Sequence, residues 1–399
     1  MVTLDYLYQI SNRKISGISL GYKRPLYRKI NWDNRLIGIK GPKGVGKSTL
    51  LLQHIKESFP DRSKVLYVSL DNIWFTTNDL TDLVEYHYTH GGTHIFLDEV
   101  HRYKWWPKVI KNLYDDYPDL HIAYTGSSIL KVKTADADLS RRLRSYDMNG
   151  LSFREYLAFE GVMDYRTLEL EEILSDHISV ASDITAGLKI LPYFEKYLET
   201  GYYPFYKEEG DGYLSRVQEV VSQTIDLDIP AIEDVEYNTL QKLKKLMVIL
   251  ANQVPFIPKM NEFYQEMQTS REQGLKLLNI LEDAKLITML KTSAKALKHI
   301  SAPDKLYLDN TNMMHALSPN AQAGTVRETF FMNQLSHSHR VSLPIKGDFK
   351  VDDKYLFEVG GRKKTFEQIK DESDSFLAID SIEVGHGNKI PLWLFGFLD

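Results

Sequence analysis

The chain has 399 residues, which is enough for two or three domains with separate hydrophobic cores. Hydrophobic residues make up 43% of it and charged residues 26%, a composition typical of a soluble globular protein. A formal net charge of -5 argues against a polycation that coats nucleic acid with its whole surface. Because the sequence has no cysteine, disulfides, thiolate zinc sites, cysteine nucleophiles and iron–sulfur clusters are excluded.

The N-terminus and the hydropathy of the sequence favour a cytoplasmic protein. The first residues, MVTLDYLYQISNRK, carry an early acid and lack an apolar core followed by a small-residue cleavage site, so they do not resemble a signal peptide. No run approaches the ~18 apolar residues that a bilayer span requires. We therefore expect a cytoplasmic location and no membrane partner.

The stretch GPKGVGKST, residues 41–49, has the spacing G-x-x-x-x-G-K-S. It follows the apolar run RLIGIK, which alternates as a buried strand does, and it precedes STLLLQHIKESF, which has helical apolar spacing. Glycines let successive backbone N–H groups turn inward, and a helix over roughly 48–59 points its N-terminus at a bound anion. The stretch therefore predicts a phosphate loop. The alternative is a chance Gly-Lys turn between two elements.

The residue types in this loop predict their roles. Lys47 would reach the β- and γ-phosphates of a nucleotide, and Ser48 would hold Mg²⁺ through its hydroxyl. The predicted nucleotide-binding residues are Gly41, Pro42, Lys43, Gly44, Val45, Gly46, Lys47, Ser48 and Thr49.

A second apolar strand, HIFLDEV at 94–100, ends in two acids. We expect Asp98 to bind Mg²⁺ through water and Glu99 to orient the attacking water. The alternative is a strand that merely ends in two surface acids, and the phosphate loop that precedes it in the chain disfavours this.

A third strand, HIAYTGSS at 121–128, offers Thr125 and Ser127 as polar residues beside the γ-phosphate; the alternative is an ordinary strand exit. KVLYVSLD at 64–71 is a further buried strand. Strands that alternate with helices predict a parallel sheet with right-handed crossovers. Such sheets bind ligands at the carboxyl ends of their strands, where all three motifs fall.

Three arginines, Arg141, Arg142 and Arg144, lie between the TGSS strand and the next expected strand, SYDMNGL. An arginine at this place can reach the γ-phosphate of a neighbouring subunit and neutralise charge in the transition state. We prefer Arg141 and Arg142 for this role, which implies a homo-oligomer. The alternative is a basic helix face that pairs with acids of the same domain.

Together, GPKGVGKST, IFLDEVH, YTGSS and SRRLRSYDMNGLSFREYL resemble a prokaryotic family of AAA+ ATPases, in which an ATPase domain precedes a C-terminal domain of unknown function. The resemblance covers nearly the whole chain and implies ATP and Mg²⁺ as ligand and cofactor. It implies an AAA+ domain at 1–157 with a Walker A loop at 41–49, a Walker B pair at Asp98 and Glu99, a sensor near Ser127 and arginine-finger candidates at Arg141 and Arg142. We find no second-sensor arginine in a lid helix, which departs from the family pattern.

Residues 158–239 are expected to form a helical linker or lid. The stretch GYYPFYKEEGDGY, 201–213, is rich in tyrosine and is broken by Gly and Pro. These aromatic side chains could stack on bases, but we favour a small core between helices.

Residues 240–325 predict a winged-helix domain. LQKLKKLMVILANQ has helical spacing, Pro258 opens a second helix, PKMNEFYQEM, and a third, TSREQGLKLLNILEDAKL, begins with two overlapping capping signals. These signals pair Thr269 with Glu272 and Ser270 with Gln273. Two strands, LITMLKT and KLYLDN, complete three helices and a two-stranded wing.

Charge in this domain favours a DNA partner. Residues 240–300 hold ten Lys and Arg against five Asp and Glu. Arg271 and Lys276 would project from the third helix toward a groove, and Lys291, Lys295 and Lys298 would lie on the wing near phosphates. The alternative is a winged helix used for packing or for contact with a protein client.

Residues 326–399 predict a small α/β module. An amphipathic helix, VRETFFMNQLSHSH, precedes VSLPI, DFKVD, YLFEVGG, a helix from Lys364 to Asp371, SFLAID and PLWLFGF. The expected order of strand, strand, helix and strand is typical of a restriction-endonuclease-like core. In such a core, an Asp and a Glu-x-Lys triplet bind Mg²⁺.

The nuclease motif is incomplete in this sequence. Asp348 and Glu358 fit the two acids, but Gly360 stands where lysine belongs, and Lys363 or Lys364 would have to replace it. We expect a degenerate nuclease fold kept for binding or assembly. His337 and His339 are expected to be surface residues rather than metal ligands.

The sequence thus predicts an α/β P-loop ATPase domain, a helical and winged-helix region and a small nuclease-like domain. The predicted function is an ATPase that couples hydrolysis to a conformational change on DNA or a protein client. The predicted catalytic residues are Lys47, Glu99, Ser127, Arg141 and Arg142. One alternative is an ATP-binding switch with little turnover, and another is an ATP-regulated nuclease.

Overall fold

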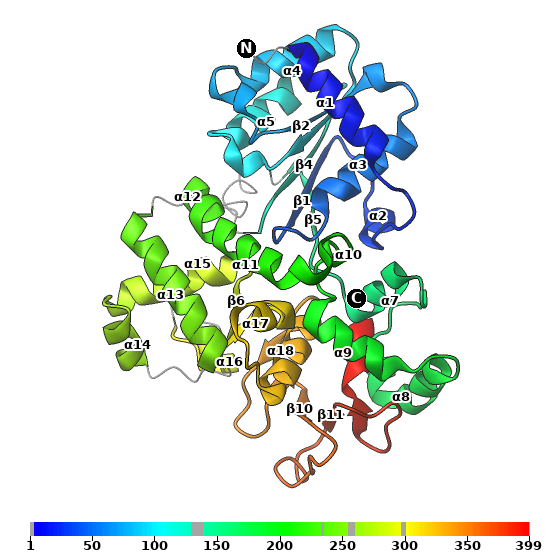
Figure 1. Cartoon of the computed structure of the whole chain (residues 1–399), viewed down its shortest axis with the longest axis vertical. Coiled ribbons are helices and arrows are strands. Elements are labelled where there is room, and N and C mark those ends of the chain that lie inside the picture. The colour runs from blue at the N-terminus through cyan, green and yellow to red at the C-terminus, as the bar shows by residue number, and fades with distance from the viewer. Residues whose placement is uncertain are drawn as a thin grey trace. The chain divides into compact units, whose positions relative to one another are not determined.

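The computed structural model describes residues 4–128, 139, 141–232, 235–253, 260–296 and 301–398, drawn in Figure 1. The chain forms two compact units. The first unit consists of Met1–Asn149 with Asp226–Val235, and the second of Gly150–Ile225 with Glu236–Asp399. The first unit therefore includes a short segment that lies, along the chain, between the two parts of the second. The four predicted domains divide the chain more finely than these two units.

The first unit is built on a parallel five-stranded sheet, as the sequence predicts. Its strands are β1 (Leu36–Gly41), β2 (Val65–Ser69), β3 (His94–Asp98), β4 (His121–Ser127) and β5 (Arg144–Asp147), in the order β2-β3-β4-β1-β5. The strand β4 lies between β1 and β3, so the three predicted motifs end on neighbouring strands. The carboxyl ends of parallel strands share one edge, so the fold gathers the motifs there.

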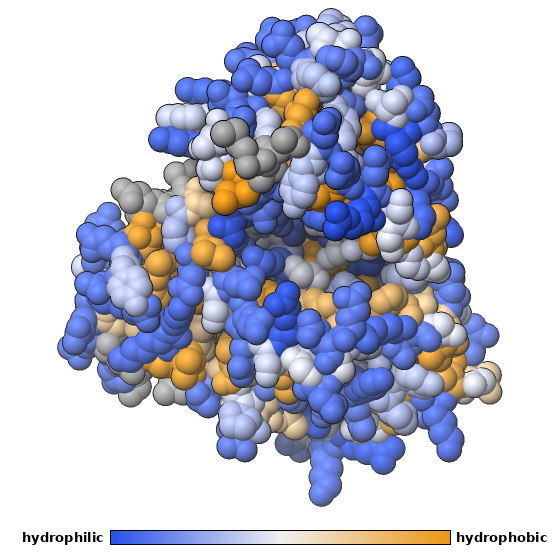
Figure 2. All heavy atoms as spheres, turned by 45° about the horizontal axis from the view of Figure 1, so that its top comes forward, coloured by the Kyte–Doolittle hydropathy of each residue, from blue (hydrophilic) through white to orange (hydrophobic). Residues whose placement is uncertain are grey.

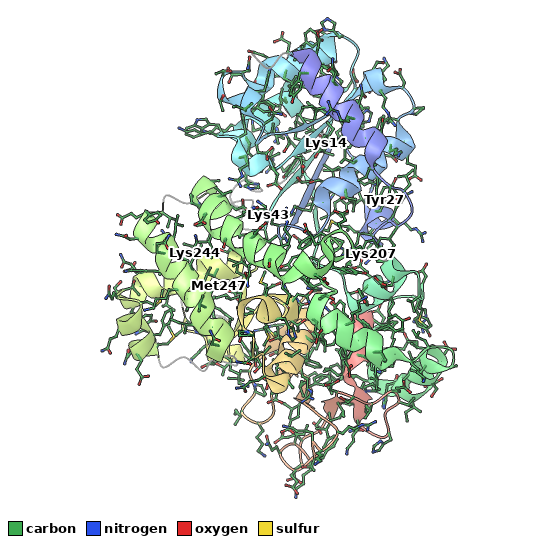
Figure 3. All side chains as sticks on the ribbon, viewed as in Figure 1. Lys14, Tyr27, Lys43, Lys207, Lys244 and Met247 are labelled. Carbon is green, nitrogen blue, oxygen red and sulfur yellow. The ribbon has the colours of Figure 1, made fainter. Side chains whose placement is uncertain are left out.

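The first unit also contains six α-helices among the described residues. They are α1 (Leu4–Gly17), α2 (Leu26–Lys29), α3 (Lys47–Ser58), α4 (Leu80–Thr89), α5 (Trp106–Asp116) and the short α12 (Ile229–Ile232). The helix α1 packs against α3 and β2, and α4 packs against α5. Lys14 of α1, labelled in Figure 3, lies 5.2 Å from the centre of the Tyr67 ring. One apolar cluster fills the unit, with Leu36, Leu66 and Ile95 from three strands fully buried in it.

Histidines gather at the opposite, amino edge of this sheet. His94 and His121 begin β3 and β4 and stack with ring centres 4.5 Å apart, and His54 of α3 stacks on Trp32 at 3.8 Å. Burial, together with the neighbouring histidines, lowers the pKa of His54 and of His94 to about 4. Both rings are therefore neutral at pH 7 and pack as flat aromatic groups.

The second unit begins with helices. They are α7 (Phe153–Glu160), α8 (Leu170–Thr185), α9 (Ile190–Thr200), α10 (Tyr206–Glu209), α11 (Tyr213–Gln223), α13 (Tyr237–Gln253), α14 (Met260–Glu266), α15 (Arg271–Asp283), α16 (Ser293–Ala296), α17 (Thr311–Leu317) and α18 (Ala323–Leu335). The tyrosine-rich stretch forms a core, as favoured from the sequence, because Tyr202, Tyr203 and Tyr213 are buried. Asn312 of α17 accepts a hydrogen bond from the Tyr202 amide at 2.8 Å.

The helices α13, α14 and α15 are followed by two antiparallel strands, β6 (Ile287–Leu290) and β7 (Lys305–Leu308), in the predicted order. Ser270 caps α15 by accepting a hydrogen bond from the Gln273 amide, so the second of the two capping signals is the one used. Figure 3 labels Lys244 and Met247 on α13, and Met247 is buried whereas Lys244 is only half-buried. Pro258 lies outside the described residues.

A second five-stranded sheet ends the chain. Its strands are β8 (Val341–Ser342), β9 (Phe349–Val351), β10 (Tyr355–Gly360), β11 (Ser375–Ile379) and β12 (Lys389–Pro391), in the order β12-β11-β10-β9-β8. The strands β8, β9 and β10 pair antiparallel, and β10, β11 and β12 pair parallel.

One predicted element of this module is wrong. The segment Lys364–Asp371 forms turns, not a helix, and Ile369 is its one buried residue. A single buried residue provides no apolar stripe for a helix to pack. The stretch PLWLFGF contributes only Pro391 to β12 and then forms the 3₁₀ helix η6 (Leu392–Phe397). A continuous apolar run does not distinguish a buried strand from a buried helical turn.

Hydrophilic residues cover most of the face shown in Figure 2, and hydrophobic ones form small groups on it. Large apolar side chains that are well exposed include Ile73, Trp105, Tyr237 and Ile345. Among the described helices, none has both the length and the apolar character that a bilayer crossing needs.

The buried histidines at the amino edge of the sheet predict that acid lowers the stability of the first unit. As the pH falls from 7 to 5, the unfolded chain takes up protons at histidines of pKa 6.5, whereas His54 and His94 stay neutral in the fold. The free energy of unfolding should therefore fall, by on the order of 2 kcal/mol at pH 5 for His54 alone. Urea unfolding followed by tryptophan fluorescence at each pH measures this loss.

The variant His54→Phe keeps a flat ring on Trp32 but cannot titrate, so it should lose less stability between pH 7 and 5 than the wild type. The matched control is His90→Phe, because His90 is exposed at the end of α4. Equal pH dependence of the wild type and His54→Phe would contradict this account.

Candidate nucleotide-binding site

The phosphate loop has the predicted strand–loop–helix setting, because β1 ends at Gly41 and α3 begins at Lys47. Gly44 and Gly46 have φ of 86° and 99°, in the left-handed region that favours glycine. A Cβ atom on Gly41 would lie 1.9 Å from the carbonyl oxygen of Met148, so the strand end leaves no room for a side chain there. These glycines therefore set the path of the loop.

Lys47 is buried, and its ammonium donates hydrogen bonds to two carbonyl oxygens of its own loop. The Nζ atom lies 2.9 Å from the Gly41 oxygen and 2.7 Å from the Pro42 oxygen. Burial lowers the pKa of Lys47, while the nearby carboxylates of Glu99, Asp98 and Asp228 act in the opposite direction. The loop thus keeps an ammonium inside its curve, facing three acids.

Arg24, which lies outside the loop in the sequence, donates hydrogen bonds that hold the loop in place. Val45 is fully buried, and its carbonyl oxygen accepts a hydrogen bond from Arg24 Nη1 at 3.3 Å. The same nitrogen donates to the carbonyl of Asn149 at 3.1 Å, which ties the loop to the chain beyond β5. Lys43, labelled in Figure 3, is half-buried, and Thr49 is exposed on α3.

Asp98 ends β3 as a buried carboxylate, and among the described residues only hydroxyl groups donate hydrogen bonds to it. The Tyr67 hydroxyl donates to Oδ2 at 2.6 Å, and the Thr125 hydroxyl donates to Oδ1. Burial and the charge of Asp98 raise the pKa of Tyr67, so this hydroxyl stays protonated and continues to donate. Within the described part of the chain, Asp98 forms no ion pair with a lysine, arginine or histidine.

The residues around Asp98 fit a divalent cation. Its negative charge is retained for a ligand, because neutral hydroxyls orient the carboxylate without cancelling that charge. The Ser48 side chain also acts on Tyr67, in the direction that lowers the pKa of Tyr67. Ser48 and Asp98, the two predicted Mg²⁺ residues, are therefore brought together around one tyrosine.

Glu99 adopts a left-handed backbone conformation, with φ 55° and ψ 45°, which is costly for a residue other than glycine. Its amide donates to the Thr125 hydroxyl oxygen at 3.1 Å, and its carboxylate is 22% exposed. The fully buried Thr125 therefore contacts both acids, from the strand that lies between β1 and β3. The expected place of Thr125 beside the γ-phosphate stays a prediction.

Ser127 is buried at the end of β4, opposite Gly41 in the register of β1 and β4. Its amide donates to His101 Nδ1 at 3.4 Å. This location is compatible with the sensor role, which stays a prediction.

The predicted arginine fingers lie at the surface of the first unit. Arg141 is exposed, and Arg142 pairs with Asp115 of α5, with Nε 2.9 Å from Oδ1. This is the contact that the alternative interpretation of a basic face predicted for Arg142. The role of either arginine toward a neighbouring subunit stays a prediction.

Three residues that the sequence did not single out border the site. Asp228, which directly precedes α12, is buried, and its Oδ1 lies 2.7 Å from Arg102 Nη2, 3.7 Å from His101 Nε2 and 4.0 Å from Lys43 Nζ. His101 and Arg102 lie two and three residues after Glu99, so the sequence does show a basic pair close to the acidic pair. Asp228 carries no such signal.

The predicted DNA-contacting residues differ in exposure. Arg271 and Lys276 are exposed on α15, and Lys291 is half-buried. Lys295 forms an ion pair with Asp304, with Nζ 2.5 Å from Oδ1. Lys298 lies outside the described residues.

The C-terminal acids also lie together. Glu358 of β10 is fully buried, and its Oε2 lies 3.3 Å from Lys364 Nζ, while Asp348 accepts a hydrogen bond from the Val359 amide at 2.9 Å. A Cβ atom on Gly360 would lie 2.8 Å from Cβ of Lys364, so the Lys364 side chain covers the position where the motif expects lysine. Of the two predicted replacements, Lys364 is the one that meets Glu358.

The predicted surface histidines are partly exposed, and His339 lies 2.7 Å from Asp352. A search of the described residues found no group of three or more His, Asp or Glu side chains suited to a metal ion.

Comparison with family models assigns the site to a known domain. Residues 33–157 match the family model of an AAA domain, and residues 191–323 match a domain of unknown function, DUF8612. The AAA match spans β1 to β5 and both acidic and phosphate-binding motifs. The first unit carries an AAA-type P-loop domain. The DUF8612 match runs from α9 to α17, so it covers part of the second unit together with the segment Asp226–Val235 of the first.

Similar full-length proteins are uncharacterized. One from Methanocaldococcus jannaschii is 27% identical and covers 90% of this chain and 82% of its own length. Another from the same organism is 24% identical and covers 76% of this chain and 66% of its own length.

Solved structures align with low scores. A chain from a structure on katanin self-assembly gives a TM-score of 0.25 at 15% identity, covering 44% of this chain and 61% of that one. The S. cerevisiae Hsp104–ADP complex gives a TM-score of 0.32 at 12% identity, covering 71% and 42%. This chain therefore spans less than two thirds of either neighbour.

Proposed function

We propose that the first unit binds ATP with Mg²⁺ and hydrolyses it, and that the chain uses this energy for a conformational change on a DNA or protein client. The observation that carries the proposal is the meeting of Lys47, Asp98, Glu99 and Thr125 at one edge of the sheet. An ammonium, a metal-ready carboxylate and a second, partly exposed carboxylate are the groups that phosphoryl transfer to water needs. The AAA-domain match over the same residues supports it.

Each group has a role in this reaction. The loop amides and Lys47 bind the phosphates, and Ser48 and Asp98 hold Mg²⁺, which neutralises charge on the phosphate oxygens. Glu99 accepts a hydrogen bond from the attacking water and orients it. Thr125 fixes both acids, because its hydroxyl donates to Asp98 and accepts from the Glu99 amide. The strained backbone of Glu99 is held in place by that second bond.

Two substitutions separate ATP binding from hydrolysis. Lys47→Ala should abolish measurable ATP binding, because it removes the only ammonium inside the loop among the described residues. Glu99→Gln should keep the affinity for ATP and lower kcat about a hundredfold or more, since the amide cannot act as the base. Phosphate release and equilibrium nucleotide binding measure the two effects.

The matched controls are Lys64→Ala and Glu85→Gln, which change exposed residues of the same unit and should leave both quantities unchanged. If the wild type binds ATP but releases phosphate no faster than Glu99→Gln does, the protein is an ATP-binding switch and the hydrolysis proposal is wrong.

We further propose that α13, α14, α15, β6 and β7 form a winged helix that contacts DNA through Arg271 and Lys276. The element order and the exposure of both side chains support it. Affinity for duplex DNA should fall as salt rises, because Lys and Arg that bind phosphates release counterions.

Arg271→Ala and Lys276→Ala should each reduce the slope of log affinity against log salt by about 1 if they contact phosphates. Fluorescence anisotropy with labelled duplex over a salt series measures this. Lys196→Ala, an exposed lysine of α9, is the control. Affinity that is flat across salt would leave packing or a protein client as the use of this domain.

For the C-terminal module we propose binding or assembly rather than DNA cleavage. Glu358 is fully buried and ion-paired, and burial raises its pKa, so it is a poor ligand for Mg²⁺. The pairing of Lys364 with Glu358 beside Asp348 is the one observation in favour of a nuclease.

We expect no Mg²⁺-dependent nicking of supercoiled plasmid by the wild type or by Lys47→Ala. Lys47→Ala removes the ATPase site but leaves this module intact, so it tests the module alone. Nicking that persists in Lys47→Ala and disappears in Asp348→Asn would establish the nuclease and contradict this proposal.

A further inference from the structure

Basic side chains from both halves of the nucleotide site converge on Asp228. Lys43 comes from the phosphate loop, and His101 and Arg102 come from the turn that follows the Walker B acids. Asp228 belongs to the segment Asp226–Val235, whose neighbours on either side along the chain belong to the second unit. At this segment the chain comes back from the second unit to the nucleotide site, and after it the chain continues into the second unit.

These contacts hold the segment in place. Arg102 makes two contacts with the segment. Its Nη2 lies 2.7 Å from Asp228 Oδ1, and its Nη1 donates to the Leu227 carbonyl at 3.0 Å. The Asp228 side chain is 1% exposed. A carboxylate buried to this degree is stable only while cations or donors surround it. The position of the segment thus depends on the charges of Lys43 and Arg102 and on the neighbouring His101 ring.

His101 connects Asp228 to Glu99. Its Nδ1 receives the hydrogen bond of the Ser127 amide, so a neutral ring carries its proton on Nε2. That Nε2 atom lies 3.3 Å from Glu99 Oε2 and 3.7 Å from Asp228 Oδ1, and it is buried without a well-formed hydrogen bond to either. One N–H group therefore faces two carboxylates, and it cannot satisfy both.

Nucleotide binding would change this balance. If the proposed function holds, ATP brings a triphosphate against the loop that carries Lys43 and Lys47. Its negative charge attracts Lys43 away from Asp228 and raises the electrostatic cost of a buried carboxylate nearby. When Asp228 has lost its contact with Lys43, the His101 N–H is free to donate to Glu99, the acid that orients water.

We propose that Asp228 is a positioning residue that latches the segment Asp226–Val235 to the nucleotide site, and that Mg²⁺ and ATP release this latch. The proposal rests on the proposed ATP binding and adds to it a route from the site to the second unit. That route is covalent, because the residues before and after the segment are part of the second unit.

Hydrogen exchange of the full chain tests the latch directly. Peptides that cover 41–49 and 226–232 are followed with and without Mg²⁺ and an uncleavable ATP analogue. The phosphate loop should gain protection from the analogue, whereas the segment should exchange at least severalfold faster with it. If Asp228 had only a structural role, the segment would exchange at the same rate or more slowly when the analogue is bound.

The two peptides separate the two claims. Protection at 41–49 with unchanged or slower exchange at 226–232 overturns the latch and leaves ATP binding intact. No protection at 41–49 overturns ATP binding, and the latch falls with it.

Asp228→Asn gives a second test, because it removes the charge and keeps the shape. Without nucleotide, its segment should already exchange at the fast rate, and the analogue should not change that rate. Its affinity for the analogue should rise severalfold, since no carboxylate competes for Lys43. Glu57→Gln, which breaks the Lys23–Glu57 ion pair of the same unit, is the control and should behave as the wild type. A lower affinity of Asp228→Asn for the analogue would contradict the proposal. If this variant does not fold, the hydrogen exchange of the wild type alone tests the proposal.

Discussion

The buried ammonium of Lys47 is the interaction on which the rest of the first unit depends. It lies inside the loop, bonded to the carbonyls of Gly41 and Pro42, and three carboxylates oppose the effect of burial on its charge. That arrangement requires β4 to lie between β1 and β3, because Thr125 of β4 joins the two acids at the end of β3. Strand order, and not loop sequence alone, therefore makes the site.

The same site has a second set of contacts, made to a segment whose neighbours along the chain belong to the second unit. Asp228 returns to it from beyond α11 and meets cations that an anionic nucleotide also attracts. A carboxylate and a triphosphate that share the same cations are coupled by charge, without any need for a long chain of packed side chains. Under the proposed function, this coupling would let the first unit act on the second, with which the segment is continuous along the chain.

The sequence predicted the local parts of this structure and missed the long-range ones. The strand–loop–helix at 41–49 and the acids at Asp98 and Glu99 follow from patterns within a few residues, and the structure agrees with them. Tyr67 and Asp228 reach the site through strand order and chain return, which no local pattern encodes. The wrong helix at Lys364–Asp371 has the opposite cause, because charged residues suited to a helix lack the buried stripe that would stabilise one. The pairing of Lys364 with Glu358 was one of two options in the sequence, and only packing over Gly360 distinguishes them.

Calorimetric titration of ATP into the full chain, with and without Mg²⁺, tests the central claim most directly. The account predicts one ATP per chain, with an affinity that Mg²⁺ raises in the wild type and does not raise in Asp98→Asn, because Asp98 is the carboxylate kept free of cations in the described structure. Heat of ATP binding that is absent in the presence of Mg²⁺, or a Mg²⁺ effect that is the same in Asp98→Asn, would contradict it.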